Sequence, residues 1–260
     1  MGPDAAAFAP IVAMFGLIVG SFLNVCIHRL PRRESIVFPP SRCARCGRKL
    51  EWYENIPVLS WLALRARCRT CGERISLMYP VVEASTAIVF VVVFLQYGPT
   101  LLGLARLLLA AALIVLFVID LQHQILPNAI TLPGIAAGFA FSLFVPPGPR
   151  DSLIGLLLGG AVPYAIAEAY LRIRGHEGLG MGDVKMLAMI GAFLGWKLML
   201  VTLLVASFSG SLVGVGFIAA GKGARYALPF GTFLAVGALV AITMGDAFIA
   251  WYLSLYQGTG

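Results

Sequence analysis

The sequence predicts an all-α polytopic membrane protein, with about eight transmembrane helices and a small zinc-binding cytoplasmic domain between helices 1 and 2. Of the 260 residues, 60% are hydrophobic and only 12% are charged, and the mean hydropathy is +0.91. Water-soluble globular domains are far less apolar. Apolar stretches of about 20 residues, the length that spans a bilayer, recur along the chain. The remaining polar sequence is concentrated in one segment, residues 28–77.

The apolar stretches define the expected spans, of which the sixth is short. They are residues 7–27, 78–96, 101–119, 129–146, 152–171, 184–196, 198–220 and 229–256. The first stretch begins within MGPDAAAFAP, which contains no Lys or Arg, and no small-residue cleavage site follows the stretch. We therefore expect a retained helix and not a removed signal peptide.

Basic residues predict the orientation of the chain. Segment 28–77 holds eleven Lys and Arg residues, and short loops rich in these residues remain in the cytoplasm. With eight alternating spans, Arg172, Arg174, Lys222 and Arg225 also fall on the cytoplasmic side. We expect no nucleic acid partner, because these basic residues lack interleaved aromatic side chains that could stack on bases.

Four cysteines form two pairs inside the polar segment. Cys43 and Cys46 make one CxxC knuckle, Cys68 and Cys71 make another, and a glycine follows each. Paired knuckles at this spacing can present four thiolates to one tetrahedral zinc ion, with no coordination position left for catalysis. Disulfides or a redox CxxC are the competing interpretations, and a cytoplasmic location disfavours stable disulfides. We therefore predict a structural zinc site.

Two aspartates lie at the ends of apolar runs. Asp120 ends the third run, and Asp183 opens the sixth within GMGDVK. Two complete spans separate them, so both should face the same, cytoplasmic boundary. Hydrolysis by an aspartic mechanism needs two carboxylates, one ionised to activate water and one protonated to donate to the carbonyl oxygen. The glycines at 180 and 182 would let the chain enter the helix at an unusual angle and a substrate approach closely.

Each aspartate also has a structural interpretation. Asp183 is well placed to cap the start of a helix. Asp120 could be an interfacial charge paired with a basic residue. Two further carboxylates, Glu83 near the start of the second span and Glu168 late in the fifth, are expected either to pair with basic residues or to line a cavity. Lys185 is expected to tune the charge of Asp183 or to extend to the interface.

Several blocks of sequence, in order, resemble the type IV prepilin peptidases over nearly the whole chain. They are GSFLNVCIHRLP at 20–31, the cysteine knuckles at 43–71, YPVVE at 79–83, IDLQHQILPNAITLP at 119–133, GMGDVKMLAMIGAFLG at 180–195 and LPFGTFLAVGA at 228–238. A GxGD pattern alone would also admit the presenilin and signal peptide peptidase families, which cleave within a helix and have no zinc domain.

The resemblance implies a function. Asp120 and Asp183 would be the catalytic pair of an aspartic endopeptidase that removes the short basic leader of type IV prepilins and of type II secretion pseudopilins. The four-cysteine domain is associated with members that also methylate the new N-terminal amine, usually of phenylalanine, using S-adenosylmethionine. The enzyme would lie in the bacterial inner membrane, with its zinc domain and active site toward the cytoplasm.

The apolar and polar stretches divide the chain into three parts: a first transmembrane helix (1–27), a cytoplasmic four-cysteine zinc domain (28–77) and a transmembrane core (78–260), which by the resemblance is the peptidase core. A different class of protein remains open from the residues alone. A proton-coupled transporter or a membrane scaffold could use the two aspartates as a proton relay and the zinc domain as a docking module. A relay would favour acids at mid-membrane, whereas both aspartates lie at span ends.

Overall fold

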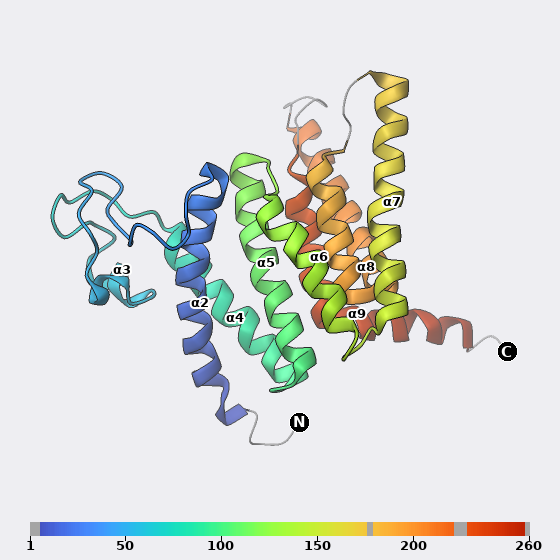
Figure 1. Ribbon diagram of the computed structural model, residues 1–260, viewed down its shortest axis with the longest axis horizontal. Coiled ribbons are helices and arrows are strands. Elements are labelled where there is room, and N and C mark those ends of the chain that lie inside the picture. Colours follow the sequence, from blue (N-terminus) through green and yellow to red (C-terminus); the bar gives the residue numbers. More distant parts are fainter. Residues whose placement is uncertain (1–5, 176–178, 221–227, 258–260) are drawn as a thin grey trace. The chain divides into compact units, whose positions relative to one another are not determined.

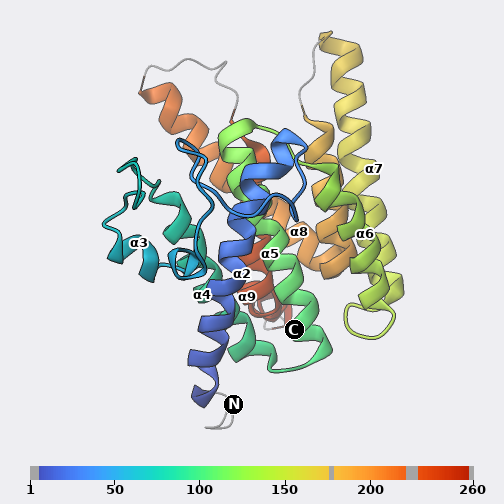
Figure 2. The same ribbon diagram turned by 60° about the vertical axis from the view of Figure 1, so that its left-hand side comes forward.

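The computed structural model describes residues 6–175, 179–220 and 228–257, and within these it is helical with no β-strand. The α-helices are α2 (Ala9–Arg29), α3 (Leu59–Ala63), α4 (Met78–Tyr97), α5 (Leu101–His123), α6 (Asn128–Ser142), α7 (Pro149–Arg174), α8 (Met181–Ala219) and α9 (Phe230–Gln257) (Figures 1 and 2). The predicted all-α fold is confirmed. Lys222 and Arg225, used above to predict orientation, lie outside the described residues.

Within the described residues, six helices are long and apolar enough to cross a bilayer, namely α2, α4, α5, α7, α8 and α9. The two remaining expected spans have local explanations. Helix α6 is apolar but has only 15 residues. Helix α8 has 39 residues, which at 1.5 Å per residue is about 58 Å, nearly twice the thickness of a hydrocarbon core. It is interrupted at Gly195, so each of the eight expected spans corresponds to a helical segment.

The interruption of α8 is stabilised by neighbouring helices. Gly195 has φ 75° and ψ 173°, a conformation that glycine adopts easily. Such a break frees backbone carbonyls, and in an apolar medium each must find a donor. Ser152 Oγ of α7 donates to the carbonyl of Ala192 at 2.6 Å, and Arg106 Nη1 of α5 donates to that of Phe193 at 3.0 Å. Arg106, in the second turn of α5, is buried, and this bond gives its guanidinium a partner.

The chain forms two compact units, Met1–Pro99 and Thr100–Gly260. In the first unit α2 packs along α4. Gly16 and Gly20 allow the close approach: a Cβ at Gly20 would lie 2.6 Å from the Cα of Glu83. The two glycines form a GxxxG pattern, which is typical of membrane helix interfaces. The division at residues 27 and 77 given above concerns the membrane boundary and stays a prediction.

The second unit contains α5 to α9. Leu109, Leu113, Leu116 and Ile119 on one side of α5 are fully buried. Helices α7 and α8 lie side by side (Figure 1). They use a second GxxxG pattern, Gly155 and Gly159. This packing brings one end of α5, α8 and α9 together, where the polar residues described next are found.

Candidate functional site

Asp120 is held by the start of α9. It lies in the last turn of α5 and is 4% exposed. Its Oδ2 accepts hydrogen bonds from the backbone N–H of Thr232 at 2.6 Å and from Thr232 Oγ1 at 3.0 Å. Thr232 is the third residue of α9, where free N–H groups and the helix dipole favour a carboxylate. Neither of the Thr232 donors binds Oδ1.

Asp183 lies in the first turn of α8. The helix N-cap is Gly180, so Asp183 is at the third helical position and not at the cap itself. Its carboxylate therefore lies beside the free N–H groups of the first turn, where the helix dipole favours a negative charge. The structural interpretation, that Asp183 is the cap, is wrong, because the cap is Gly180; a position in the first turn also does not explain why the carboxylate faces Asp120.

The structure brings the two aspartates together. They are close enough to interact electrostatically, although 63 positions separate them in the sequence. Leu126, in the connection from α5 to α6, packs beside Gly182, which precedes Asp183, and beside Gly231 at the start of α9. A Cβ at Gly182 would lie 2.9 Å from Leu126 Cβ, and a Cβ at Gly231 would lie 2.9 Å from Leu126 Cδ1 and 3.0 Å from Asp120 Oδ2.

Glycine at 182 and 231 is therefore required by packing within the chain. The expected reason for the GxGD glycines, an unusual entry angle, is wrong for Gly180, because its φ is −70°. The block at 228–238 stands out in the sequence, but the sequence alone predicts no role for Thr232 or Gly231. The sequence signal that could have indicated this role is a threonine next to a glycine at the start of an apolar span.

The other polar residues near the span ends have different partners. Lys185 Nζ donates to Asn128 Oδ1 at 3.0 Å, which ties α8 to the start of α6. Glu168 pairs with Arg172 one turn later on α7 at 2.8 Å, which confirms the expectation that it pairs with a basic residue. In the first unit, Glu83 accepts the backbone N–H of Val58 at 2.7 Å, so this buried carboxylate holds the polar segment against α4.

The four cysteines form one cluster. Their sulfur atoms all lie within 4.8 Å of one another, and Cys43 Sγ and Cys71 Sγ are 3.8 Å apart. Tetrahedral zinc with bonds of about 2.3 Å places its sulfur ligands about 3.8 Å apart. A disulfide would need about 2.05 Å. The donor set therefore fits a metal ion and not a pair of disulfides.

The two knuckles share one backbone geometry. In each, the first cysteine's N–H bonds to a carbonyl five residues later, and the glycine's N–H bonds back to the first cysteine's carbonyl. These bonds are Cys43 N–H to Arg48 O, Gly47 N–H to Cys43 O, Cys68 N–H to Glu73 O and Gly72 N–H to Cys68 O. Gly47 and Gly72 have φ of 71° and 69°, which explains the glycine after each CxxC.

Hydrogen bonds and ion pairs inside the polar segment stabilise this arrangement. The backbone N–H groups of Cys71 and Thr70 lower the pKa of the Cys68 thiol to about 6, which favours the thiolate that a metal needs. Arg45 links the knuckles through Glu73 at 2.6 Å. Arg48 pairs with the buried Glu54 at 2.6 Å, and this bond, together with the Glu51 N–H, lowers the pKa of Glu54.

Comparison with known proteins identifies relatives over most of the chain. Residues 14–97 match the Bacterial Peptidase A24 N-terminal domain, and residues 107–215 match the Type IV leader peptidase family. The prepilin leader peptidase/N-methyltransferase of Aeromonas salmonicida is 38% identical, covering 94% of this chain and 93% of the relative. The protein of the same name from Myxococcus xanthus is 46% identical, and the match covers 80% of this chain and 64% of the relative.

A third relative with the same name, from Pseudomonas aeruginosa, is 35% identical, covering 95% of this chain and 94% of its own length. No solved structure matches the chain. The matches include both aspartates and all four cysteines within the two family domains. On this evidence the chain belongs to the type IV leader peptidase family.

Proposed function

We propose that this chain cleaves the short basic leader from type IV prepilins and type II secretion pseudopilins, with Asp120 and Asp183 as its catalytic pair. One observation carries the proposal: carboxylates from the end of α5 and the start of α8 lie close together, in a chain similar to proteins named prepilin leader peptidase/N-methyltransferase. Two adjacent carboxylates at a membrane boundary can activate water and donate a proton to a peptide carbonyl.

The mechanism assigns a task to each side chain of the site. One aspartate, as the carboxylate, takes a proton from a water molecule while the water attacks the scissile carbonyl carbon. The other, protonated, donates to the carbonyl oxygen, and the leaving amine is protonated later. Thr232 holds Asp120 through Oδ2, so this carboxylate is oriented before substrate binds, and the first turn of α8 places Asp183 near it.

The second proposed activity is methylation of the new N-terminal amine, with S-adenosylmethionine as the methyl donor. It is supported by the names of the relatives. For the four-cysteine cluster we propose zinc, held by Cys43, Cys46, Cys68 and Cys71. Four thiolates saturate the ion, so its part would be to hold the two knuckles together and not to catalyse.

The chain is a multi-pass membrane protein, and we place it in the bacterial inner membrane with the active site toward the cytoplasm. Support comes from the eleven Lys and Arg residues of segment 28–77, because such segments remain in the cytoplasm. The lipid bilayer and the prepilin would be its partners, and no nucleic acid is expected. A basic leader would need acidic partners, but Glu54 and Glu73 of this segment are already paired with arginines.

A cleavage assay on the full chain in lipid or detergent tests the proposal. Wild type, Asp120→Asn and Asp183→Asn would each be incubated with a prepilin, after zinc content and thermal unfolding have been measured. Loss of cleavage in both folded variants is the expected result. Cleavage that persists in either variant would remove that aspartate from the catalytic pair.

A matched assay separates the second activity. Labelled S-adenosylmethionine and a pilin whose leader has already been removed would be given to the same three proteins. If methylation is a separate reaction, Asp120→Asn and Asp183→Asn should still transfer the label. Absence of transfer from the wild type would exclude methylation of that pilin.

A further inference from the structure

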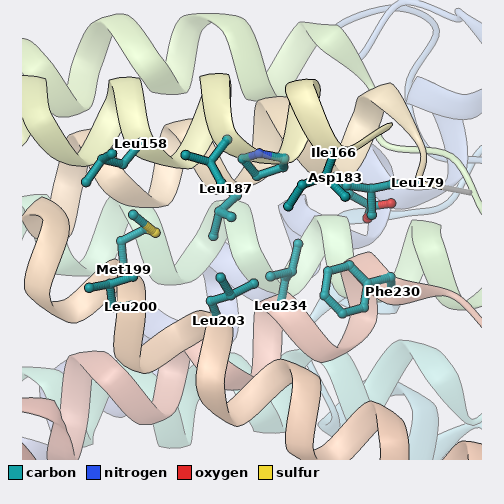
Figure 3. A pocket seen from close by; sticks show the side chains of 12 residues that line it. Leu158, Ile166, Leu179, Asp183, Leu187, Met199, Leu200, Leu203, Phe230 and Leu234 are labelled. Atoms are coloured by element: carbon teal, nitrogen blue, oxygen red, sulfur yellow. The ribbon is translucent and has the colours of Figure 1, made fainter. Parts of the chain in front are cut away.

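An apolar groove runs along the second unit and ends at Asp183 (Figure 3). Its walls come from α7, α8 and α9, and it encloses about 250 Å³. Ile166, Phe230 and Asp183 lie at one end, and Leu158 and Met199 lie at the other. Asp183 is the one ionisable residue among the residues that line it.

The groove is open along α7. Leu158, Val162 and Ile166 repeat every four residues, so they form one stripe along this helix. They are 39%, 47% and 61% exposed, which leaves the wall of α7 only partly covered. Leu187 and Leu234 close the groove in the middle from α8 and α9. A chain segment can therefore reach the groove from the side, within the plane of the membrane.

Lipid contact explains the apolar walls but not the carboxylate. An ionisable group inside an apolar wall is costly unless it has a function there. In the proposed reaction, Asp183 must meet the scissile bond. The resemblance to prepilin peptidases implies a substrate with a short basic leader before that bond and a hydrophobic helix after it, so only the part that follows the bond matches these walls.

We propose that the groove is the docking site for the apolar segment that follows the scissile bond of a prepilin, with the bond itself at Asp183. This inference rests on the proposed function and adds the position and direction of the substrate. The enclosed volume is below that of a typical site for a drug-sized ligand, about 300–1,000 Å³. It would hold the first apolar side chains, and the rest of the substrate helix would lie along the open side of α7.

Two neighbouring leucines of α8 provide a matched test. Leu203 lines the groove, whereas Leu204 does not line it and is 57% exposed. Tryptophan at 203 should fill the groove, and tryptophan at 204 should leave it unchanged. We expect Leu203→Trp to raise KM for a prepilin about tenfold, within the range for one misplaced apolar group. Leu204→Trp should match the wild type.

The substrate supplies a second comparison. A prepilin with alanine at the first apolar positions after the bond should bind the wild type more weakly, and Leu203→Trp should add little to that defect. If lipid alone occupies the groove, Leu203→Trp will have the same KM as Leu204→Trp. If Leu203→Trp raises KM by the same factor for the normal prepilin and for the alanine-substituted prepilin, the proposal is also contradicted. The tryptophan would then act at a place that the apolar segment does not occupy.

A second pair of variants guards against misfolding. Ile166 lies on the exposed rim of the groove, and Tyr164 is on the same helix, 49% exposed and outside the lining. Ile166→Trp should raise KM, and Tyr164→Trp should not. Cleavage by the wild type, with loss in Asp183→Asn, tests the proposed function separately. If the wild type cleaves and neither groove variant differs from its control, the groove proposal alone is wrong; if the wild type fails to cleave, both proposals fall.

Discussion

Thr232 donates two hydrogen bonds to a single oxygen of Asp120, although 112 positions separate the two residues. The donors are of different kinds: one is the backbone N–H and the other is the hydroxyl. The first turn of α9 thereby fixes the carboxylate at the end of α5. Neither partner is free to turn, because both are buried.

This relationship predicts a role for the hydroxyl in positioning Asp120. Thr232→Val keeps the shape and the backbone donor but removes the hydroxyl, whereas Thr232→Ser keeps the hydroxyl. A hydrogen bond to a charged group contributes about 1.5–3 kcal/mol, so we expect Thr232→Val to lower kcat at least about tenfold. KM should change little, and Thr232→Ser should restore most of the rate. Steady-state cleavage of a prepilin measures both constants.

Thr202→Val is the control for the loss of a buried threonine hydroxyl. Thr202 is fully buried, and its hydroxyl bonds to the carbonyl of Leu198 in its own helix. Thr202→Val should retain the wild-type kcat. A normal kcat in Thr232→Val, or equal losses in Thr232→Val and Thr232→Ser, would contradict the positioning role.

The ion pairs of the cysteine segment should differ in strength because they differ in burial. The side chains of Arg45 and Glu73 are 72% and 41% exposed, whereas the Glu54 side chain is 1% exposed. Exposed pairs contribute about 0–1 kcal/mol, and removing one partner of a buried pair costs more. Glu54→Gln should therefore lower resistance to urea more than Glu73→Gln does, measured on the full chain by tryptophan fluorescence.

The effect of Glu54→Gln should also depend on pH. The Arg48 guanidinium and the Glu51 N–H hold the pKa of Glu54 below its usual range, which is about 4.3. A carboxyl with a lowered pKa stabilises the folded state above the unfolded value and loses that contribution as pH falls through the folded value. The difference in unfolding free energy between wild type and Glu54→Gln should be constant near neutral pH and shrink in acid. A difference that grows in acid would contradict this assignment.

Much of the site follows from sequence because it depends on local patterns. Each CxxC with its glycine defines a knuckle within six residues, and the alternation of apolar runs places Asp120 and Asp183 at the same boundary. The role of Thr232 could not be predicted in the same way. It depends on which helix end packs against α5, and an apolar run gives its length but not its neighbours. The same reason applies to Glu83, whose partner is a backbone N–H and not a basic side chain.

Buried Arg106 should stabilise the break in α8 through its bond to the Phe193 carbonyl. Arg106→Met keeps an unbranched side chain but removes the donor, which leaves a carbonyl unsatisfied in an apolar region. We expect a loss of about 1–2 kcal/mol and a fall in apparent Tm of several degrees. Arg150→Met is a control, because Arg150 is exposed at the start of α7. Thermal unfolding in detergent compares them, and equal Tm values for the two variants would show that the bond is not stabilising.

The same substitution, glycine to alanine, should affect stability differently at two adjacent glycines of α7. A Cβ at Gly159 would lie 2.7 Å from the backbone carbonyl oxygen of Leu187, whereas a Cβ at Gly160 would meet only the Ala188 Cβ at an ordinary 3.6 Å. Alanine favours a helix over glycine by about 1 kcal/mol. Gly160→Ala should therefore be neutral or stabilising, and Gly159→Ala should force α7 away from α8 and lower the apparent Tm.

The same pair connects packing to the proposed substrate groove. Leu187 lies in the wall of the groove, one helical turn after Asp183, so displacement of its backbone should also alter the position of the groove relative to the carboxylate. We expect Gly159→Ala to reduce kcat/KM for a prepilin even at temperatures where the protein remains folded, and Gly160→Ala to retain it. If both variants are as stable and as active as the wild type, close contact between α7 and α8 at Gly159 is not required, because α7 can then move without cost.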